Sequence, residues 1–394
     1  MLNKTMYHLG AERSCIRELF EYGLRQAAVV GAENVFDYSL GNPSIPAPAA
    51  VNQSIVDTLA TENSLQVHGY TPAAGSADVR QAVAEDLNRR FDAGIRPSNL
   101  FFCCGAAPGL VSVLRALSVP EAEIIAIAPY FPEYKPFVEN AGCKFVAVPA
   151  DTDGFQIRFD ALENAINAHT QAVIINSPNN PSGTVYTLQT LQKLAQLLSC
   201  AGEKFGHPIY LIADEPYREL VYDGVQVPFV PNVYANTIVC YSWSKSLSLP
   251  GERIGYVCVP DQAADSKDLF AAIAGAARIC GHVCPPSLMQ RVVAKCVSCP
   301  PDLAAYEKNR ALLYNSLTEM GYSMAKPDGA FYLFIKAPNG DGDAFSELAK
   351  KDNLLLVPGR DFGCADYFRI CYCVDYDMIV RSLPIFKKLL AEVS

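Results

Sequence analysis

The sequence contains no hydrophobic run long enough to cross a membrane and no surplus of basic residues. A transmembrane helix needs roughly 20 consecutive apolar residues, and no run approaches that length. Lysine and arginine number 32 against 41 acidic residues, which gives a formal net charge of −9. Because nucleic acids and anionic membranes attract basic surfaces, we expect neither a nucleic acid nor a membrane as a partner.

The sequence also lacks the patterns of an exported or zinc-binding protein. Residues 1–6 do not form a charged segment followed by an apolar one, so we expect a cytoplasmic protein whose 14 cysteines are reduced thiols. Cys296 and Cys299 have the C-x-x-C spacing of half a zinc site, but no second pair accompanies them. We therefore expect no metal site.

The chain is long enough for two domains or for one large domain with a smaller lobe. It has 394 residues, of which 50% are hydrophobic and 19% charged, so it can build a sizeable core. We find no internal repeat and no low-complexity tract. The composition is that of an ordinary globular protein.

Short apolar strands alternate with helical segments through the first two thirds of the chain. The predicted strands include 123–128, 172–175, 209–213 and 237–241, and such alternation indicates an α/β fold with a mostly parallel sheet flanked by helices. We assign this large domain to residues 47–285. Beyond a long helical region near 285–320, the less regular order predicts a smaller α+β domain.

The domain boundaries follow from this pattern. Residues 1–46 are expected to form an N-terminal arm and part of the small domain, and residues 286–394 the rest of that small domain. The large domain lies between them.

Polar residues follow several of the predicted strands. Asn180, Asp214 and Lys245 each come shortly after an apolar strand, and the carboxyl ends of parallel strands meet at one edge of a sheet. We expect these three side chains to converge there. That convergence predicts a ligand site.

Lys245 is the centre of the predicted site. A lysine in a dry pocket near other cations loses its proton more readily and can form a Schiff base with an aldehyde. Ser242 and Arg253 could bind a phosphate, and an aldehyde that carries a phosphate is pyridoxal phosphate. The alternative is an ordinary solvated lysine in a Ser/Gly loop.

Three residues could tune the ring of such a cofactor. An aspartate facing the pyridine nitrogen keeps it protonated, and Asp214 is the candidate for that role. Tyr217 and the amide of Asn180 could donate hydrogen bonds to the ring oxygen. Phe131, at a strand end, could stack on the ring or could be a core aromatic.

Arg369 stands in an otherwise apolar strand. An unpaired charge is costly to bury, so a bidentate contact with a substrate carboxylate would explain it, and a structural salt bridge is the alternative. Gly41 begins a Gly-Asn-Pro turn where backbone can approach a ligand, although it could be an ordinary turn. The turn at Gly105 before a helix is likewise either a phosphate site or a structural turn.

With these motifs identified, the chain resembles the class I aminotransferases, fold-type-I pyridoxal-phosphate-dependent enzymes that include the aspartate aminotransferases. The resemblance runs from Gly41 to the C-terminal helix. It rests on three motifs in the family's order: Asn-Asn-Pro-Ser-Gly at 179–183, Asp-Glu-Pro-Tyr at 214–217, and Ser242-x-x-Lys245 with Gly251-x-Arg253-x-Gly255.

The resemblance implies a role for each site residue. Lys245 would hold pyridoxal phosphate as a Schiff base and shuttle a proton, and Asp214 and Tyr217 would act with it in catalysis. The site would lie at the interface of a homodimer. The implied cofactor-binding residues are Lys245, Asn180, Asp214, Tyr217, Ser242, Arg253, Phe131, Ala106, Ala107 and the partner's Tyr70, and the implied substrate-binding residues are Arg369, Gly41 and Asn180.

The resemblance further implies transfer of an amino group from an L-amino acid to a 2-oxo acid, with glutamate and 2-oxoglutarate as one pair. Ile279 stands where dicarboxylate-specific members carry an arginine, with Arg278 beside it, so the side chain of the donor stays open. Tyr70, Phe331 and Tyr332 could line its pocket. A C–S β-lyase on the same scaffold and a non-catalytic ligand sensor are the alternative functions.

Overall fold

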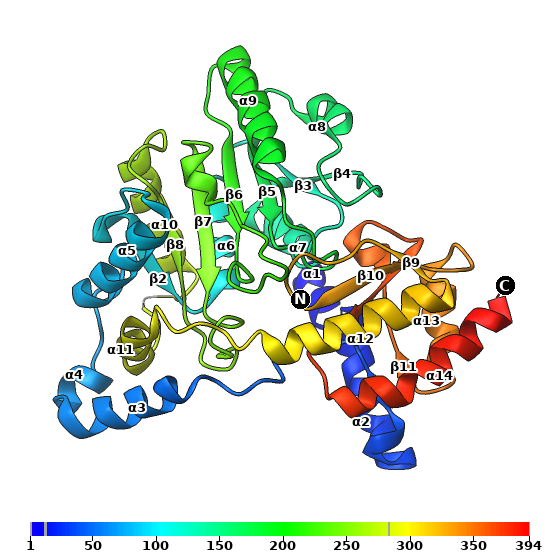
Figure 1. Cartoon of the computed structure of the whole chain (residues 1–394). Helices are drawn as coiled ribbons and strands as arrows, with labels where there is room; N and C mark the ends of the chain where they lie inside the picture. The colour runs from blue at the N-terminus through cyan, green and yellow to red at the C-terminus, as the bar shows by residue number, and fades with distance from the viewer. Residues whose placement is uncertain (1, 12–13, 283, 394) are drawn as a thin grey trace.

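The computed structural model describes residues 2–11, 14–282 and 284–393, and it confirms the predicted α/β fold class. Its main feature is a seven-stranded sheet (Figure 1). In spatial order the strands are β2 (Leu100–Cys103), β8 (Gly255–Cys258), β7 (Thr237–Ser242), β6 (Tyr210–Asp214), β5 (Thr170–Asn176), β3 (Glu123–Ile127) and β4 (Lys144–Val148).

The strands of this sheet are mostly parallel. Pairs β7–β6, β6–β5, β5–β3 and β3–β4 are parallel, whereas β8 is antiparallel to both of its neighbours. Because β8 is reversed between β2 and β7, these two strands still point the same way. The carboxyl ends of β2, β3, β5, β6 and β7 therefore share one edge.

Helices cover both faces of the sheet because its strands are apolar on both sides. Alternate residues of β5 separate into two cores: Val173 and Ile175 pack in one, and Ala172 and Ile174 in the other. The first face carries α5 (Ala77–Phe91), α8 (Phe159–Ala165), α9 (Leu188–Phe205) and α11 (Ser287–Cys296), and the second carries α6 (Ala106–Ala116), α7 (Tyr134–Ala141) and α10 (Ser266–Ile279).

A second lobe has its own sheet and core. Its antiparallel strands lie in the order β12 (Val357–Pro358), β13 (Tyr367–Cys371), β10 (Tyr332–Lys336) and β9 (Ser323–Met324). Around them lie α12 (Ala304–Met320), α13 (Gly342–Lys350) and α14 (Tyr376–Val393), on the right in Figure 1. Buried residues of all these helices form one core with β10 and β13.

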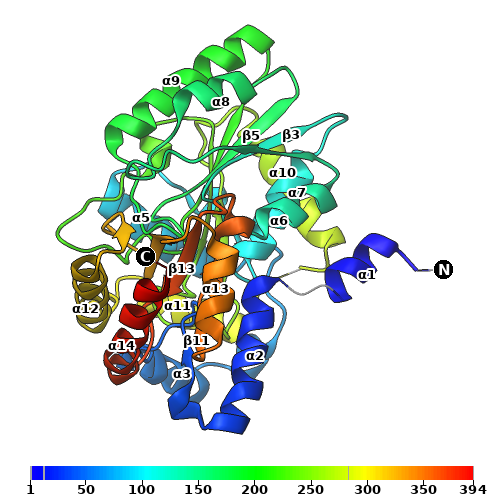
Figure 2. The same ribbon diagram turned by 90° about the vertical axis from the view of Figure 1, so that its right-hand side faces the viewer.

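The N-terminal segment joins this second lobe. Strand β1 (Phe36–Asp37) pairs in parallel with β11 (Leu354–Leu355), and α2 (Cys15–Val30) lies against β12. Helix α1 (Lys4–Ala11) buries no residue and projects from the body of the molecule (Figure 2). We propose residues 46 and 285 as the limits between the two lobes.

The connection between the lobes differs from the long helical region predicted from the sequence. Helix α11 ends at Cys296 and α12 begins only at Ala304. Pro300 and Pro301 lie in the gap, and proline lacks the N–H group that a continuing helix requires. Within the described residues, no helix is long and apolar enough to span a membrane.

Candidate active site

A cavity of about 540 Å³ lies at the carboxyl edge of the large sheet and reaches the second lobe. Every residue predicted to bind the cofactor or the substrate lines it except Tyr70. Of the other aromatic candidates for the side-chain pocket, Tyr332 lines the cavity and Phe331 is not among the described residues that do. The lining set contains Gly41, Ala106, Ala107, Phe131, Asn180, Asp214, Tyr217, Ser242, Lys245, Arg253 and Arg369. The convergence expected of residues that are far apart in the sequence is thus present.

Lys245 lies in this cavity just beyond the end of β7. Its Nζ donates to the carbonyl oxygen of Gly41 at 2.6 Å and lies 5.4 Å from the centre of the Phe331 ring. Burial lowers the pKa of the Lys245 ammonium, and the nearby positive charges of Arg369 and Arg253 lower it further. The amine is therefore more easily deprotonated, and hence more nucleophilic, than that of a surface lysine.

Asp214 ends β6 inside the cavity wall. Its Oδ2 accepts a hydrogen bond from the Tyr134 hydroxyl at 2.5 Å, whereas its buried Oδ1 has no partner in the described part of the chain. Burial raises the pKa of the carboxyl from 3.8 to about 7, and the bond from Tyr134 opposes this rise. An unpartnered buried carboxylate oxygen is costly, so Oδ1 fits a site for a protonated nitrogen.

Arg369 is buried yet has no carboxylate partner among the residues that the structure describes. Its Nη1 donates to Asn180 Oδ1 at 3.0 Å and its Nη2 to the Ser39 carbonyl at 2.5 Å, while Nε is unpartnered. The structural salt bridge considered above is therefore not formed with a described carboxylate. The bond to Asn180 also leaves the Asn180 Nδ2 group available to donate into the cavity.

The turn after β2 forms a small cradle. Gly105 has φ +95° and precedes α6, so the backbone N–H groups of Ala106 and Ala107 lie in the unbonded first turn of that helix. A Cβ at Gly105 would come within 2.8 Å of Arg253 Nη2. Together with Ser242, whose Oγ donates to Ser244 Oγ at 3.1 Å, these groups fit a phosphate.

Three further aromatic side chains, Tyr217, Tyr332 and Phe131, line the cavity that contains Lys245. The Tyr217 hydroxyl lies 2.9 Å from that of Tyr332, and both rings are buried. Phe131 lines the cavity and also packs against the core beneath the sheet, so it has the core contact considered for it, and its stacking on a cofactor ring stays a prediction. The core contact can fix the ring against whatever binds above it.

Tyr70 is the one predicted site residue that lies apart. It follows α4 (Ser64–His68), is 96% exposed, and is not among the described residues that line the cavity. This position outside the cavity agrees with the contact across a subunit interface expected of Tyr70.

Sequence reasoning missed two residues that support the site. Tyr134 begins α7 and contacts Asp214 across 80 positions of sequence, which no local motif signals. Asn176 lies at the end of β5, and its Nδ2 donates to the Asp214 carbonyl while its Oδ1 accepts from the Asn180 backbone. A polar residue ending an apolar strand was the available signal for Asn176.

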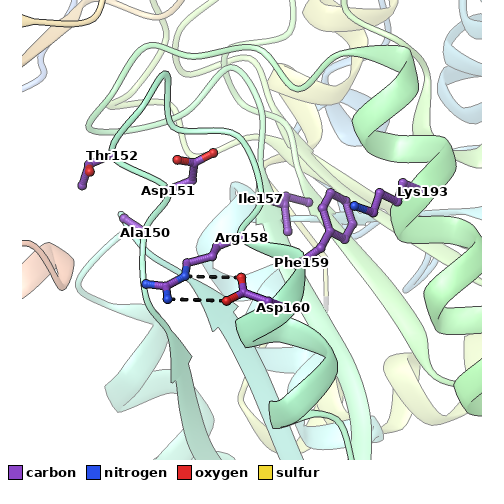
Figure 3. Close-up of a pocket in the computed structure, with 8 residues that line it drawn as sticks. All are labelled: Ala150, Asp151, Thr152, Ile157, Arg158, Phe159, Asp160 and Lys193. Atoms are coloured by element: carbon purple, nitrogen blue, oxygen red, sulfur yellow. Dashed lines mark hydrogen bonds and ion pairs between the residues drawn. The ribbon is translucent and has the colours of Figure 1, made fainter.

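A second cavity of about 500 Å³ contains none of the predicted site residues. Figure 3 shows that Arg158 within it points toward Asp160, with which it forms an ion pair at 3.3 Å. Lys193 lies 4.2 Å from the centre of the Phe159 ring. Its charged groups are already engaged, so the cavity at Lys245 is the better site.

The groups around Lys245 fit pyridoxal phosphate. The cavity offers an amine, a buried carboxylate oxygen without a partner and a phosphate cradle at its far end. The described residues contain no cluster of three or more His, Cys, Asp or Glu side chains that could hold a metal ion. Fold and site together define a pyridoxal-phosphate enzyme of fold type I.

Comparison with known proteins identifies the family. Residues 32–382 match the model of aminotransferase class I and II, and the chain belongs to that family. It is a pyridoxal-phosphate-dependent aminotransferase, as the resemblance implied. Its substrates are accordingly amino acids and 2-oxo acids.

Several relatives cover almost the whole chain. An aromatic-amino-acid aminotransferase 2 of Thermococcus litoralis is 29% identical, covering 96% of this chain and 95% of the relative. An aspartate aminotransferase of Bacillus subtilis is also 29% identical, with 92% of each covered. A crystal structure of an aminotransferase from Eubacterium rectale superposes with a TM-score of 0.98 at 54% identity, covering 100% of this chain and 99% of that one.

Proposed function

We propose that Lys245 is the residue to which the cofactor is covalently attached, and that glutamate and 2-oxoglutarate form one of the two substrate pairs. The observation that supports the attachment is the part-buried Lys245 amine, in one cavity with Asp214 and Arg369. The family of named aminotransferases favours amino transfer over the C–S β-lyase alternative.

Each side chain then has a chemical task. Pyridoxal phosphate supplies an aldehyde and an electron-withdrawing ring that acidifies the α-hydrogen of a bound amino acid. Asp214 Oδ1 holds a proton at the ring nitrogen, and Lys245 Nζ accepts the α-proton. Tyr217 and Asn180 Nδ2 would donate to the ring oxygen, and Phe131 would pack against the ring.

The two ends of the cavity bind the two anionic groups. Ser242, Arg253 and the N–H groups of Ala106 and Ala107 bind the phosphate. Arg369 binds the α-carboxylate of the substrate, with Asn180 and the Gly41 backbone beside it. Because Arg369 is held by Asn180 and the Ser39 carbonyl, its guanidinium is oriented before the substrate arrives.

We propose that the enzyme is a homodimer whose sites are shared, with Tyr70 of one protomer contacting the phosphate held by its partner. The support is the 96% exposure of Tyr70 together with the exposed Leu65 and Ile279 side chains. Where exposed apolar side chains form one contiguous patch, that patch is typical of an interface.

Reduction with borohydride tests the attachment. The treated enzyme should carry the cofactor on the peptide that contains Lys245, as peptide mass spectrometry would show, and Lys245→Ala should carry none. Label on another lysine would refute the assignment. Formation of glutamate from 2-oxoglutarate with a panel of amino donors tests the pairing, whereas pyruvate and thiol release without glutamate would indicate the lyase.

A further inference from the structure

Tyr332 lies between the groups assigned to the cofactor and the group assigned to the substrate. It begins β10, is 2% exposed and lines the cavity. In the pairing of β10 with β13, Tyr332 lies opposite Cys371 and Phe334 lies opposite Arg369. Because side chains two apart in a strand share a face, Tyr332 and Arg369 lie on the same face of the small sheet.

The Tyr332 hydroxyl contacts the cofactor side of the site. It lies 2.9 Å from the Tyr217 hydroxyl, and a Cβ at Gly41 would overlap it. Gly41 in turn accepts the hydrogen bond from Lys245 Nζ. If Tyr332 is the donor in the tyrosine pair, the Tyr217 proton is free to point into the cavity, and accepting a bond makes Tyr217 a stronger donor.

The Tyr332 ring contacts the substrate side. The Arg369 guanidinium carbon lies 4.6 Å from the ring centre, within the range of a cation–π contact. This contact adds to the two hydrogen bonds that hold Arg369 and leaves its Nε unpartnered. The ring is thus positioned to restrict the guanidinium on one face.

We propose that Tyr332 is a positioning residue with two separable functions, in which its hydroxyl orients the Tyr217 proton and its ring orients Arg369. This inference rests on the proposed roles of Tyr217 and Arg369. It assigns to one side chain the alignment of both the cofactor contact and the carboxylate contact.

Tyr332→Phe in the holoenzyme tests the hydroxyl. Without the Tyr332 hydroxyl to orient its proton, Tyr217 should stabilise the negative charge of the ring oxygen less well. The midpoint of the pH titration of the visible cofactor band should therefore rise by about half to one pH unit. Binding of maleate, an unreactive carboxylate probe, should change by less than about twofold. The charged and titratable groups around the tyrosine pair, Tyr134, Asp214, Lys245, Arg369, Cys371 and Cys373, stay in place.

Tyr332→Leu tests the ring. Loss of the aromatic face should weaken maleate binding about five- to tenfold beyond the effect of Tyr332→Phe. Tyr332→Met, whose unbranched side chain adapts to irregular gaps, replaces it if the leucine variant does not fold. Equal maleate affinity in the phenylalanine and aliphatic variants would overturn the function of the ring.

A double-mutant cycle completes the design. If the hydroxyl acts through Tyr217, the shift caused by Tyr332→Phe should vanish in a Tyr217→Phe background. A shift that persists there, or no shift in Tyr332→Phe alone, would overturn the inference. Tyr372→Phe is the matched control, because the hydroxyl of this buried tyrosine donates to the Ala330 carbonyl rather than to Tyr217 or Tyr332, so its loss should leave the midpoint unchanged.

The failure of this inference can be distinguished from the failure of the proposed function. A wild-type enzyme that carries the cofactor at Lys245 and transfers amino groups supports that function whatever the Tyr332 variants do. If the wild type does neither, the proposed function fails before any variant is compared.

Discussion

At the scale of single residues, the site depends on one ionisable group held in an unfavourable environment. Asp214 is buried and its Oδ1 has no partner in the described part of the chain. Its carboxyl binds a proton more tightly in the folded protein than in the unfolded chain, because burial raises its pKa from 3.8 to about 7. A cationic ring beside it would relieve that cost.

The stability of the cofactor-free protein should depend on pH because of this buried carboxyl. Because the folded pKa is the higher one, the stabilisation from protonated Asp214 is complete below about pH 4 and is lost as the pH rises through about 7. The loss is roughly 4 kcal/mol at most. Between pH 5 and pH 8, the thermal unfolding midpoint of the wild type should therefore fall further than that of Asp214→Asn.

The exposed Asp268 provides the control for this comparison. The thermal unfolding midpoint of Asp268→Asn should change between the two pH values as much as that of the wild type. If Asp214→Asn showed the same pH dependence as the wild type, Asp214 would not be the strained acid described above.

Tyr134→Phe should lower turnover, although Tyr134 is not among the residues proposed to bind the substrate. The change removes the 2.5 Å hydrogen bond that lowers the pKa of Asp214, so less of the carboxylate is ionised near neutral pH. We expect turnover to fall about fivefold at pH 7 and less at pH 9. Tyr130→Phe, in the segment between β3 and α7, is the control and should leave turnover unchanged. A loss of turnover in Tyr134→Phe that is equal at both pH values would contradict this account.

Sequence reasoning identified the residues that follow strands and not those that support them. Asn180, Asp214 and Lys245 could be assigned because parallel strand ends converge, and the structure brings all three to one cavity. Tyr134 could not, because its contact depends on how α7 packs against β6. Helix packing of this kind leaves no short sequence pattern.

At the scale of elements, the start of α6 carries the phosphate cradle. Gly105 adopts a left-handed φ of +95° that favours glycine, and it packs against Arg253. Alternating strands and helices predicted this strand, turn and helix. They did not predict the interruption between α11 and α12, since the apolar pattern on either side of Pro300 and Pro301 suggested one helical region.

Gly105→Ala should weaken the binding of pyridoxal phosphate. The new Cβ would be strained by the backbone and would come within 2.8 Å of Arg253 Nη2, so we expect the dissociation constant to rise about tenfold. Gly275→Ala, inside α10, is the control because a Cβ there meets no atom within 4 Å among the described residues. Equal cofactor affinity in both variants would rule out a phosphate site at this turn.

At the scale of the whole molecule, the proposed dimer determines whether each protomer can work alone. The structure describes one chain, in which Tyr70 is outside the cavity that contains Lys245. A hybrid dimer of one Tyr70→Phe protomer and one Lys245→Ala protomer would contain one intact site and one doubly altered site. Its activity should be about half that of the wild type, provided that Tyr70 acts across the interface.

The hybrid can be isolated by giving the two protomers different affinity tags. The parent homodimers serve as controls, since each has both sites altered. A hybrid no more active than Tyr70→Phe would place Tyr70 outside the partner's site.

The most direct test of the central claim is the absorbance spectrum of the purified enzyme while single amino acids are added without any 2-oxo acid. We predict a visible cofactor band that disappears in favour of the amine form of the cofactor with the correct donor, and no such band in Lys245→Ala. A visible band that persists while pyruvate accumulates, or a wild-type protein with no band, would contradict the assignment of Lys245 to amino transfer.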